Sequence, residues 1–545
     1  MIKELRFRIS FLTVISVVAL FALTACAPIA PPPTTAPPTT APPTTAPPTT
    51  APPATPGSPP APGVTPGVGE RYSIGTINLA DIWVDPVSGS DTNSGATRTQ
   101  ALRSVGEAWR RVPASVVLTQ GYRIQLVAGE YPESSLVNYW ENRWGTATNP
   151  IILNAVDGPH TAVFRSDMNV FNTRYLYVIG VDILPNRDAF HCEQCSYILL
   201  RQMELSGGAR SAHETIKVNQ SNHVYIEDSN IHGADDNSID FVAVQYGHIR
   251  GNRIHDAQDW CVYTKGGSAY ISVSENEIFN CGTGGFTSGQ GTGFEFMTSP
   301  WLHYEAYGIS VTNNIIHDTE GAGLGVNGGY NILMAYNTLY RVGSRSHAVE
   351  FVHGGRGCDG DTATCAAHQS AGGWGGTGAE GQFIPSKHIY FFNNIVYNPA
   401  GFQSRWSHFS VHGPLTPPSG SNVANPARAD EDLRIAGNII YNGPADLDLG
   451  LEDGCASSNP TCNSTQLRAD NAINTILPQL VNPAGGDYSP VAGGNVSTRA
   501  SVAIPSFSWS DAPSVPAVPG GSTNNAVGRN RSGAVRSGWG WPGAY

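Results

Sequence analysis

A short pattern of apolar and polar positions recurs along the chain from about residue 174. Each copy has alternating apolar residues, then an Asn, then two apolar or aromatic residues, as in Val311-Thr-Asn-Asn-Ile-Ile-His317. This alternation predicts short β-strands, because successive side chains of a strand point to opposite faces. The Asn residues that mark the copies are Asn252, Asn276, Asn314, Asn337, Asn394 and Asn438.

The spacing of these Asn residues indicates a stack of coils. Successive members lie 24, 38, 23, 57 and 44 residues apart, so two steps equal one short unit and the larger steps contain inserted loops. A period in the low twenties with two or three short strands per unit is typical of a solenoid, whereas a β-propeller blade needs about 40 residues. In such a stack we expect the repeated Asn side chains to form a ladder of hydrogen bonds.

The segment that leads into the repeats supports the same fold. Trp-Val-Asp-Pro-Val-Ser-Gly-Ser-Asp-Thr-Asn-Ser-Gly at 83–95 precedes an amphipathic helix, and Ile124-Gln-Leu-Val-Ala-Gly-Glu-Tyr131 then opens the first coil. With the repeats, these residues resemble the right-handed parallel β-helix of the pectin-lyase-like superfamily. The helix would be an N-terminal cap, with its apolar face made by Leu102, Val105, Ala108, Trp109 and Val112.

The resemblance implies an all-β fold, a right-handed parallel β-helix with a capping helix and long inserted loops. We expect this domain at 71–445, followed at 446–545 by a Gly-, Pro- and Ser-rich segment that packs on the β-helix or caps it. The fold hosts lyases, hydrolases, epimerases and binding proteins, so it does not by itself assign an activity.

The N-terminus has the pattern of a bacterial lipoprotein signal peptide. Three basic residues precede an apolar run at 9–22, which is too short to span a bilayer. Leu23-Thr24-Ala25-Cys26 then resembles a lipobox. We expect removal of residues 1–25 and lipidation of Cys26, and an ordinary secretory signal is the alternative.

The repeats of Pro, Thr and Ala that follow predict an extended stalk over 26–70. The mature protein would then be held to a membrane by its lipid alone and would work outside the cytoplasm, as a periplasmic or cell-surface lipoprotein. The formal net charge is −12 and no basic run is present, which argues against nucleic acid as a partner. We expect a monomer.

Eight cysteines remain once Cys26 is set aside, and they lie as close neighbours in the sequence. Their even number, their proximity and the predicted secretion favour disulfides over metal sites. The expected pairs are Cys192–Cys195, Cys261–Cys281, Cys358–Cys365 and Cys455–Cys462.

Alignment of the coils predicts columns of outward-facing side chains. The middle residues of predicted strands at 216–218, 239–241, 294–296 and 349–351 would bring Lys217, Asp240, Glu295 and Glu350 onto one outer face. Stacked strands lie about 4.8 Å apart, so neighbouring carboxylates would be within reach of one Ca²⁺, which prefers oxygen ligands. A solvated polar turn is the alternative. The candidate ligands are Asp235, Asp236, Asp240 and Asp259, the last placed in a column with Glu214 and Asn237.

Lys265 lies close to this acidic cluster, in the sequence Thr-Lys-Gly-Gly-Ser. An acidic cluster on one coil with a Lys on the next resembles the calcium-dependent polysaccharide lyases of this fold, which implies that Lys265 is the base. Removal of a proton α to a uronate carboxylate builds negative charge that a bound cation stabilises. The alternative is a surface Lys before a Gly-Gly turn.

Further candidates lie on and near the inserted loops. His347 and His353 are alternative catalytic residues. On one strand they would share a face and Glu350 would lie on the other, so we do not expect all three to converge. Aromatic and charged side chains beside a groove are typical of sugar binding, and the candidate substrate-binding residues are Trp260, Glu295, Trp301 and Arg356.

These features favour an extracellular carbohydrate-active protein, most specifically a calcium-assisted lyase that cleaves an acidic, uronate-containing polysaccharide by β-elimination. A non-catalytic glycan-binding or envelope protein is one alternative. A glycoside hydrolase is another, with Asp240 and either Glu295 or Asp259 as its carboxylate pair.

Overall fold

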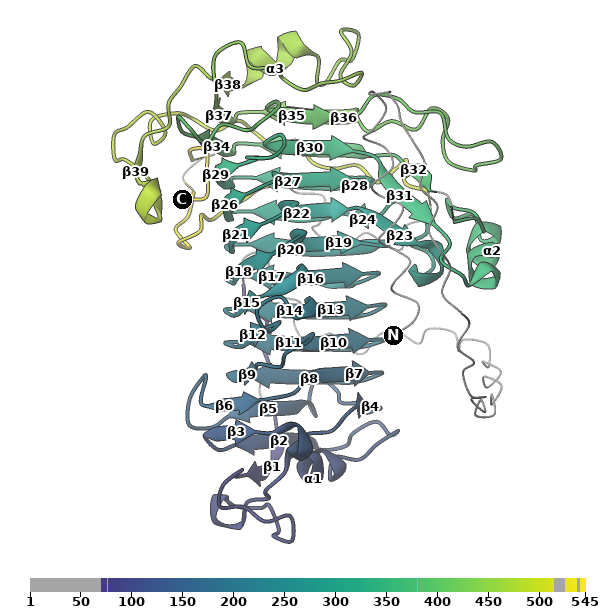
Figure 1. The fold of residues 1–545 in the computed structure, drawn as a ribbon, viewed down its shortest axis with the longest axis vertical. Coiled ribbons are helices and arrows are strands. Elements are labelled where there is room, and N and C mark those ends of the chain that lie inside the picture. The colour runs from purple at the N-terminus through teal and green to yellow at the C-terminus, as the bar shows by residue number, and fades with distance from the viewer. Residues whose placement is uncertain (1–69, 76, 380, 514–524, 537–539) are drawn as a thin grey trace, which may run out of the picture. The chain divides into compact units, whose positions relative to one another are not determined.

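Three long parallel sheets are stacked around one core in the structure, a computed structural model (Figure 1). It describes residues 70–75, 77–379, 381–513, 525–536 and 540–545. The predicted signal peptide, Cys26 and the stalk up to residue 69 lie outside the described residues. No helix in the described part of the chain is long and apolar enough to cross a membrane.

In the regular part of the stack a coil contributes one strand to each sheet, and each strand pairs in parallel with its equivalent one coil later. Sheet 1 consists of β1 (Leu79–Val84), β2 (Gly121–Leu126), β5 (Ile151–Ala155), β8 (Arg174–Ile179), β11 (Ser196–Arg201), β14 (Asn222–Glu227), β17 (Gln245–Arg250), β20 (Ser268–Ser274), β24 (Ala306–Tyr307), β25 (Ser310–Thr312), β28 (Gly329–Ala335), β33 (Lys387–Phe392) and β36 (Glu431–Ala436). Sheet 2 consists of β4 (Trp140–Glu141), β7 (Met168–Phe171), β10 (Phe190–Glu193), β13 (Ala212–Asn219), β16 (Ala234–Val242), β19 (Trp260–Lys265), β22 (Gly284–Gly289), β27 (Ala322–Asn327), β30 (Val349–Val352) and β35 (Phe409–Val411). Sheet 3 consists of β3 (Gly129–Tyr131), β6 (Ala162–Phe164), β9 (Val181–Ile183), β12 (Glu204–Ser206), β15 (Asn230–His232), β18 (Arg253–Ala257), β21 (Glu277–Cys281), β26 (Ile315–Thr319), β29 (Thr338–Val342), β34 (Ile395–Asn398), β37 (Ile439–Asn442) and β38 (Ala472–Ile473).

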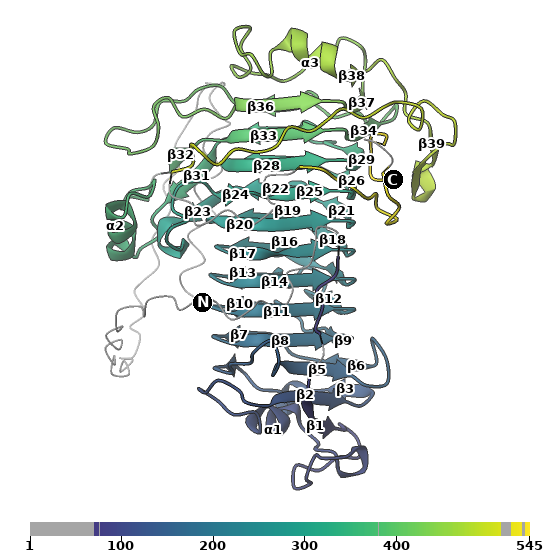
Figure 2. The ribbon, with the colours of Figure 1, turned by 180° about the vertical axis from the view of Figure 1, so that it is seen from behind.

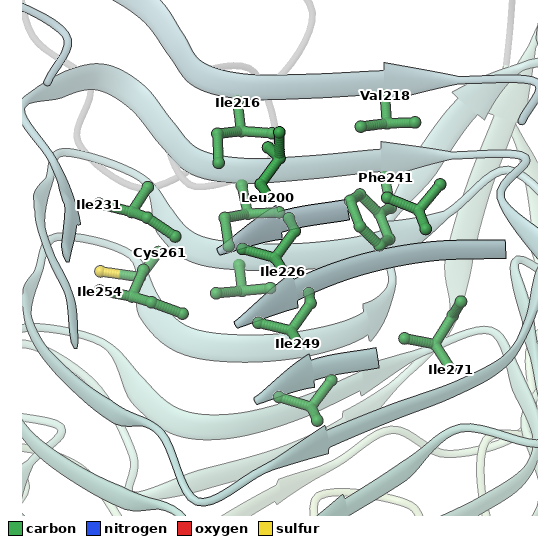
Figure 3. Packing of buried hydrophobic residues seen from close by; sticks show 14 of the residues in the cluster. Leu200, Ile216, Val218, Ile226, Ile231, Phe241, Ile249, Ile254, Cys261 and Ile271 are labelled. Atoms are coloured by element: carbon green, nitrogen blue, oxygen red, sulfur yellow. The ribbon is translucent and has the colours of Figure 1, made fainter. Parts of the chain in front are cut away.

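The inward side chains of these strands form columns of like residues. Leu200, Ile226 and Ile249 occupy equivalent positions on successive strands of sheet 1 and are fully buried (Figure 3). On sheet 2, Val218 pairs in register with Phe241 in the same way. Because each buried side chain packs against its counterparts above and below, the apolar alternation of the sequence is sufficient to build the core.

The predicted Asn ladder is confirmed. Asn314 donates from its backbone N–H and its side-chain amide to Oδ1 of Asn337, both at 3.0 Å, and its own Oδ1 accepts the same two bonds from Asn276. The ladder begins at Asn252 and extends one step beyond the prediction, to Asn471. It satisfies buried polar groups at every bend that it passes.

The predicted helix covers the N-terminal end of the stack. It is α1 (Val105–Arg110), whose first turn is capped by the Ser104 hydroxyl accepting from the Glu107 N–H. Val105, Ala108 and Trp109 are buried in the main core together with Val84 and Leu126 of the first strands. The apolar spacing in the sequence therefore predicted the cap correctly.

The long inserts form structure of their own beside the stack. Between β22 and β35 they contribute a small sheet of β23 (Gly291–Gly293), β31 (Gly354–Gly357) and β32 (Gln382–Ile384), the short helix η4 (Phe294–Phe296) and α2 (Thr362–Ser370), which stand at one side in Figure 1. We call this group the loop module. The remaining elements are η2 (Arg98–Gln100), η3 (Glu133–Ser135), α3 (Ser464–Asp470), η5 (Pro483–Gly485), β39 (Leu480–Asn482) and β40 (Asp487–Pro490).

The C-terminal segment packs against the coils. The segment crosses sheet 1 in Figure 2. The indole of Trp509 lies 5.4 Å from the ring of Tyr270. Arg536 donates a hydrogen bond to Oδ1 of Asn313 at 2.9 Å. All four predicted disulfides are formed: Cys192–Cys195, Cys261–Cys281, Cys358–Cys365 and Cys455–Cys462. Such bonds persist in oxidising compartments, which indicates a location outside the cytoplasm.

Candidate functional site

One outward column of sheet 2 carries most of the charged side chains. Lys217 on β13, Asp240 on β16 and Tyr263 on β19 occupy equivalent positions. Further along, the column continues through Thr287 and Gly325 to Glu350. The predicted places of Lys217, Asp240 and Glu350 on this face are therefore confirmed.

The predicted place of Glu295 in this column is wrong. Residues 294–296 alternate as a strand would, but they form η4 in the loop module, and β22 supplies the strand at this level of the stack. The register of β19 also differs from the expectation by one residue. Val262 points into the core and Tyr263 faces outward, because Val262 pairs with the buried Ile239.

Asp240 lies between two lysines on this face. Its Oδ1 is 3.7 Å from Nζ of Lys265, and its Oδ2 is 3.9 Å from Nζ of Lys217, which also contacts Glu214 at 2.7 Å. Asp240 is only 2 % exposed, and burial raises the pKa of its carboxyl although Lys265 and Lys217 oppose the rise. Oδ1 has no hydrogen-bond partner among the described residues, so this buried oxygen is available to a ligand.

Asp236 and Asp259 lie at the same edge of sheet 2 on adjacent coils. The Asp259 N–H donates to the Asp236 carbonyl at 3.1 Å, so Asp259 aligns with Asp236 and not with Glu214 and Asn237 as expected. The one-residue difference in the register of β19 explains this, because Tyr263, and not Val262, pairs with Asp240. Burial, and then the like charge of Asp259, raise the pKa of Asp236 to about 7.

Three other residues complete this edge. The hydroxyl of Tyr263 donates to Asp259, and Nε2 of Gln258 donates to Asp235 at 2.7 Å. His213 bridges Glu214 at 2.8 Å and Asp236 at 3.4 Å. The hydrogen bond to Glu214 raises the pKa of His213 to about 9, so the imidazole is positively charged at neutral pH.

The residues at this edge fit a divalent cation. Carboxylate oxygens of Glu214 and Asp236 lie within 4.8 Å of each other, beside the His213 ring. The Asp240 oxygen that accepts no hydrogen bond and the pKa of Asp236, which burial raises, both mark carboxylates whose negative charge a bound cation would stabilise. Hard oxygen donors of this kind suit Ca²⁺.

Lys265 is the last residue of β19 and is held in place from two sides. Its Nζ lies 4.2 Å from the centroid of the Tyr263 ring, and its side chain is 15 % exposed. Gly266 and Gly267 follow with φ of 64° and 82°, and a Cβ on Gly267 would lie 2.3 Å from the Trp301 carbonyl oxygen. The Gly-Gly turn therefore allows the loop module to approach Lys265 closely.

Comparison with known proteins assigns the fold. A family model described as "Right handed beta helix region" matches residues 169–403, the part of the chain with the most regular parallel coils. The protein is a right-handed parallel β-helix.

The β-helix also resembles several solved structures. A pectate lyase is 12 % identical with a TM-score of 0.42, over 80 % of this chain and 95 % of that chain. A rhamnogalacturonan lyase is 12 % identical with a TM-score of 0.41, over 66 % and 87 %. The A-module of a mannuronan C-5 epimerase from Azotobacter vinelandii is 12 % identical with a TM-score of 0.38, over 63 % and 88 %. No curated protein matches the chain in sequence.

His347 and Glu350 form a separate polar pair along the same face of the β-helix. Nε2 of His347 lies 2.9 Å from Oε2 of Glu350, so the expectation that they lie on opposite faces is wrong. His347 lies before the start of β30, so the alternation of side chains along a strand does not apply to it. Four strand pairings separate Glu350 from Asp240, which is about 19 Å at 4.8 Å per step. His353 contacts the Ala427 carbonyl at 3.1 Å, and neither histidine joins the Lys265 cluster.

Three predicted substrate-binding residues are buried in the β-helix. Trp260 is 2 % exposed because its ring lies across Gly284, where a Cβ would be 2.3 Å from the indole. Trp301 is 4 % exposed and packs against Tyr270 and Tyr307. Arg356 is 1 % exposed. Trp260 packs within sheet 2 and the other two within the inserts, and none of the three presents a surface to substrate.

The sequence did not single out several residues that shape the site. Lys217 and Glu214 were placed on the predicted coils but were not assigned to the site, although Lys217 is in the same column as Asp240. Glu305, which contacts both Arg356 and Gly266, lies in an irregular insert with no repeat to place it.

Proposed function

We propose that this β-helix is a polysaccharide lyase that cleaves an acidic, uronate-containing glycan by β-elimination. The observation that carries the proposal is the position of the Lys265 amino group, on the outer face of sheet 2 and 3.7 Å from a buried carboxylate with a free oxygen. An amine and an ion-binding carboxylate cluster are the two components that such a reaction needs in one place.

Each group has a defined task in the proposed reaction. The amine of Lys265 takes the proton α to the uronate carboxylate, and the electron pair of that C–H bond forms a carbon–carbon double bond. The bond from the β-carbon to the glycosidic oxygen breaks, and the oxygen leaves with its electron pair and takes a proton from water. Lys217, 3.9 Å from Asp240, adds positive charge on the same face. Tyr263 and the Gly-Gly turn keep Lys265 in one orientation, which reduces the entropic part of the barrier.

A calcium ion would be held by Asp236 and Asp240, with Glu214 beside them. When bound, it would supply the positive charge that stabilises the enolate-like state of the uronate. The other two candidates, Asp235 and Asp259, already accept hydrogen bonds from Gln258 and Tyr263. They would orient the ligands Asp236 and Asp240.

The test is a turnover assay on a panel of uronic-acid polysaccharides with the Lys265→Ala variant. We expect the wild-type protein to release products with an unsaturated, ultraviolet-absorbing end. Lys265→Ala should lower the rate by about 10²–10⁴-fold, the usual contribution of a general base. Lys387→Ala is the matched control, because Lys387 lies on sheet 1 in ion pairs with Glu431 and Asp511.

The possible results separate the function classes. Reducing ends without ultraviolet absorbance would contradict the lyase and indicate a hydrolase. Binding without any product would indicate a glycan-binding protein. A wild-type rate in Lys265→Ala would place the base elsewhere, with His347 the next residue to change.

A further inference from the structure

A pocket of about 380 Å³ opens where the loop module meets the edge of sheet 2. One wall is formed by Gln194 and Gln220, which follow β10 and β13. The other is formed by η4, the residues after it and α2. Nε2 of Gln220 donates to the Phe296 carbonyl at 3.2 Å, which joins the two walls at one point. A cavity of this size is in the range that accommodates a small ligand.

The pocket is beside the proposed catalytic lysine. Met297, one of its lining residues, has Cε 3.3 Å from where a Cβ on Gly267 would be. Gly267 is two residues after Lys265, so the pocket borders the turn that follows the proposed base.

The loop module that forms the outer wall is firmly built. Arg356 and Glu305 form an ion pair with neither side chain exposed, and Arg356 also donates to the carbonyls of Leu302, His303 and Trp374. The Cys358–Cys365 disulfide holds the start of α2. A wall fixed in this way presents its polar groups in one arrangement, which lowers the entropic cost of binding.

The lining groups suit an uncharged sugar. The side chains of Gln194, Gln220, Thr298, Ser299 and Thr364 offer amides and hydroxyls, which hydrogen-bond to sugar hydroxyls. Nε2 of His368 is buried and has no hydrogen-bond partner among the described residues, and burial lowers the pKa of this imidazole. A polar atom left unsatisfied at the wall of a pocket is a place for a ligand.

The charge of the pocket excludes a uronate. Glu295 is the charged side chain among the lining residues, and neither Lys nor Arg lines the pocket. Asp359 is close enough for the charge of Glu295 to contribute, after burial, to raising the pKa of Asp359. A sugar carboxylate would therefore meet like charge and no counter-ion here, whereas Lys217 provides positive charge at the catalytic cluster.

We propose that this pocket binds an uncharged sugar residue next to the uronate that lies at Lys265. The inference rests on the proposed function and makes it more specific. The substrate is a heteropolysaccharide in which uronate and neutral residues are adjacent, and homopolymers of uronate are poor substrates.

Binding is measured by calorimetry in the Lys265→Ala background, so that no turnover occurs. The probes are oligogalacturonate and an oligosaccharide that alternates galacturonate with rhamnose. Ser299→Trp fills the pocket from an exposed position, and Ser370→Trp, at the end of α2 and outside the pocket, is the matched control.

We expect the alternating oligosaccharide to bind more tightly than oligogalacturonate. Ser299→Trp should weaken binding of the alternating oligosaccharide by about tenfold, which is the scale of one lost subsite. The affinity for oligogalacturonate should stay unchanged. Ser370→Trp should change neither affinity. Glu295→Gln keeps the acceptor for the Asp359 N–H and should improve oligogalacturonate binding several-fold.

Equal affinity of the two probes, or no effect of Ser299→Trp on the alternating probe, overturns the inference. The lyase proposal fails separately. If Ser299-dependent binding of the alternating probe is found but the Lys265-containing protein forms no unsaturated product, the pocket assignment stands and the lyase assignment does not.

Discussion

Arg356 and Glu305 form an ion pair at 2.5 Å with no part of either side chain exposed to solvent. The second oxygen of Glu305 accepts hydrogen bonds from the Gly266 N–H at 3.0 Å and from the Thr292 hydroxyl at 2.6 Å. One carboxylate thus connects the loop module to the turn that follows Lys265. The ion pair therefore affects both the stability of the loop module and the position of the proposed base.

Removal of one partner of this pair should be strongly destabilising. Arg356→Met leaves the Glu305 carboxylate buried and unpaired, which costs about 3–5 kcal/mol in comparable pairs. Arg253→Met is the control, since it breaks the exposed pair with Glu277 and should cost less than about 1 kcal/mol. Denaturant unfolding measures both. The double variant Arg356→Met with Glu305→Gln should recover part of the loss, and equal destabilisation by single and double variants would contradict the argument.

Calcium should bind to the carboxylates of the Lys265 cluster and raise the unfolding temperature of the wild-type protein. Asp236→Asn and Asp240→Asn each remove one anionic ligand and should weaken calcium binding by at least about tenfold, because ligand charge sets affinity at such sites. The exposed Asp446→Asn is the control. Calorimetric titration that detects no calcium binding, or unchanged binding in both variants, would remove the ion from the proposed mechanism.

The middle of the Asn ladder should contribute more to stability than an outer Asn. Asn314→Ala leaves the Asn276 backbone N–H, an N–H of the Asn276 side-chain amide and the Val273 carbonyl without their partner, which should cost at least about 2 kcal/mol. In Asn222→Ala the lost contact is with the adjacent His223, and we expect a loss below about 1 kcal/mol. Similar unfolding free energies for the two variants would show that the ladder is not a main source of stability.

Stability should fall on mild acidification because of His408. Burial lowers the pKa of this imidazole to about 4, against an ordinary value of 6.5. Above about pH 6.5 the ring is neutral in the folded and the unfolded chain. Between pH 6.5 and 4 the unfolded chain takes up a proton that the folded chain does not, which disfavours folding by up to about 3 kcal/mol.

His408→Gln should flatten the dependence of the unfolding free energy on pH in that interval. His412→Gln, at a side chain that is 39 % exposed, should leave the dependence as in the wild type. The measurement is denaturant unfolding at several pH values. A slope in His408→Gln equal to that of the wild type would show that other groups cause the acid sensitivity.

The sequence predicted those parts of the β-helix that follow from repetition. The Asn ladder and the column of Leu200, Ile226 and Ile249 recur from coil to coil. An error in assigning one copy of the repeat is therefore corrected by comparison with the other copies. The disulfides could be paired because their cysteines are close in the sequence, as with the 20 residues between Cys261 and Cys281. Because the coils repeat, their alignment also predicted that Lys217 and Asp240 lie on one face.

Non-repeating features could not be predicted in this way. Residues 294–296 alternate like a strand but lie in an insert, and the register of β19, in which Tyr263 pairs with Asp240, brings Asp259 into line with Asp236. The burial of Arg356 depends on Glu305, 51 residues away in the chain. No local pattern shows that two side chains in different inserts will meet, so Arg356 resembled a substrate-binding residue.

The Asn ladder has a consequence for how such a molecule changes over time. Its hydrogen bonds have nearly the same lengths whether 23 residues separate the partners, as for Asn314 and Asn337, or 57, as for Asn337 and Asn394. The stacking of the coils therefore does not depend on how many residues are inserted between two successive Asn residues of the ladder. During evolution, inserted loops can be lengthened, exchanged or deleted, which changes the glycan that is recognised. The coils of the β-helix keep their structure.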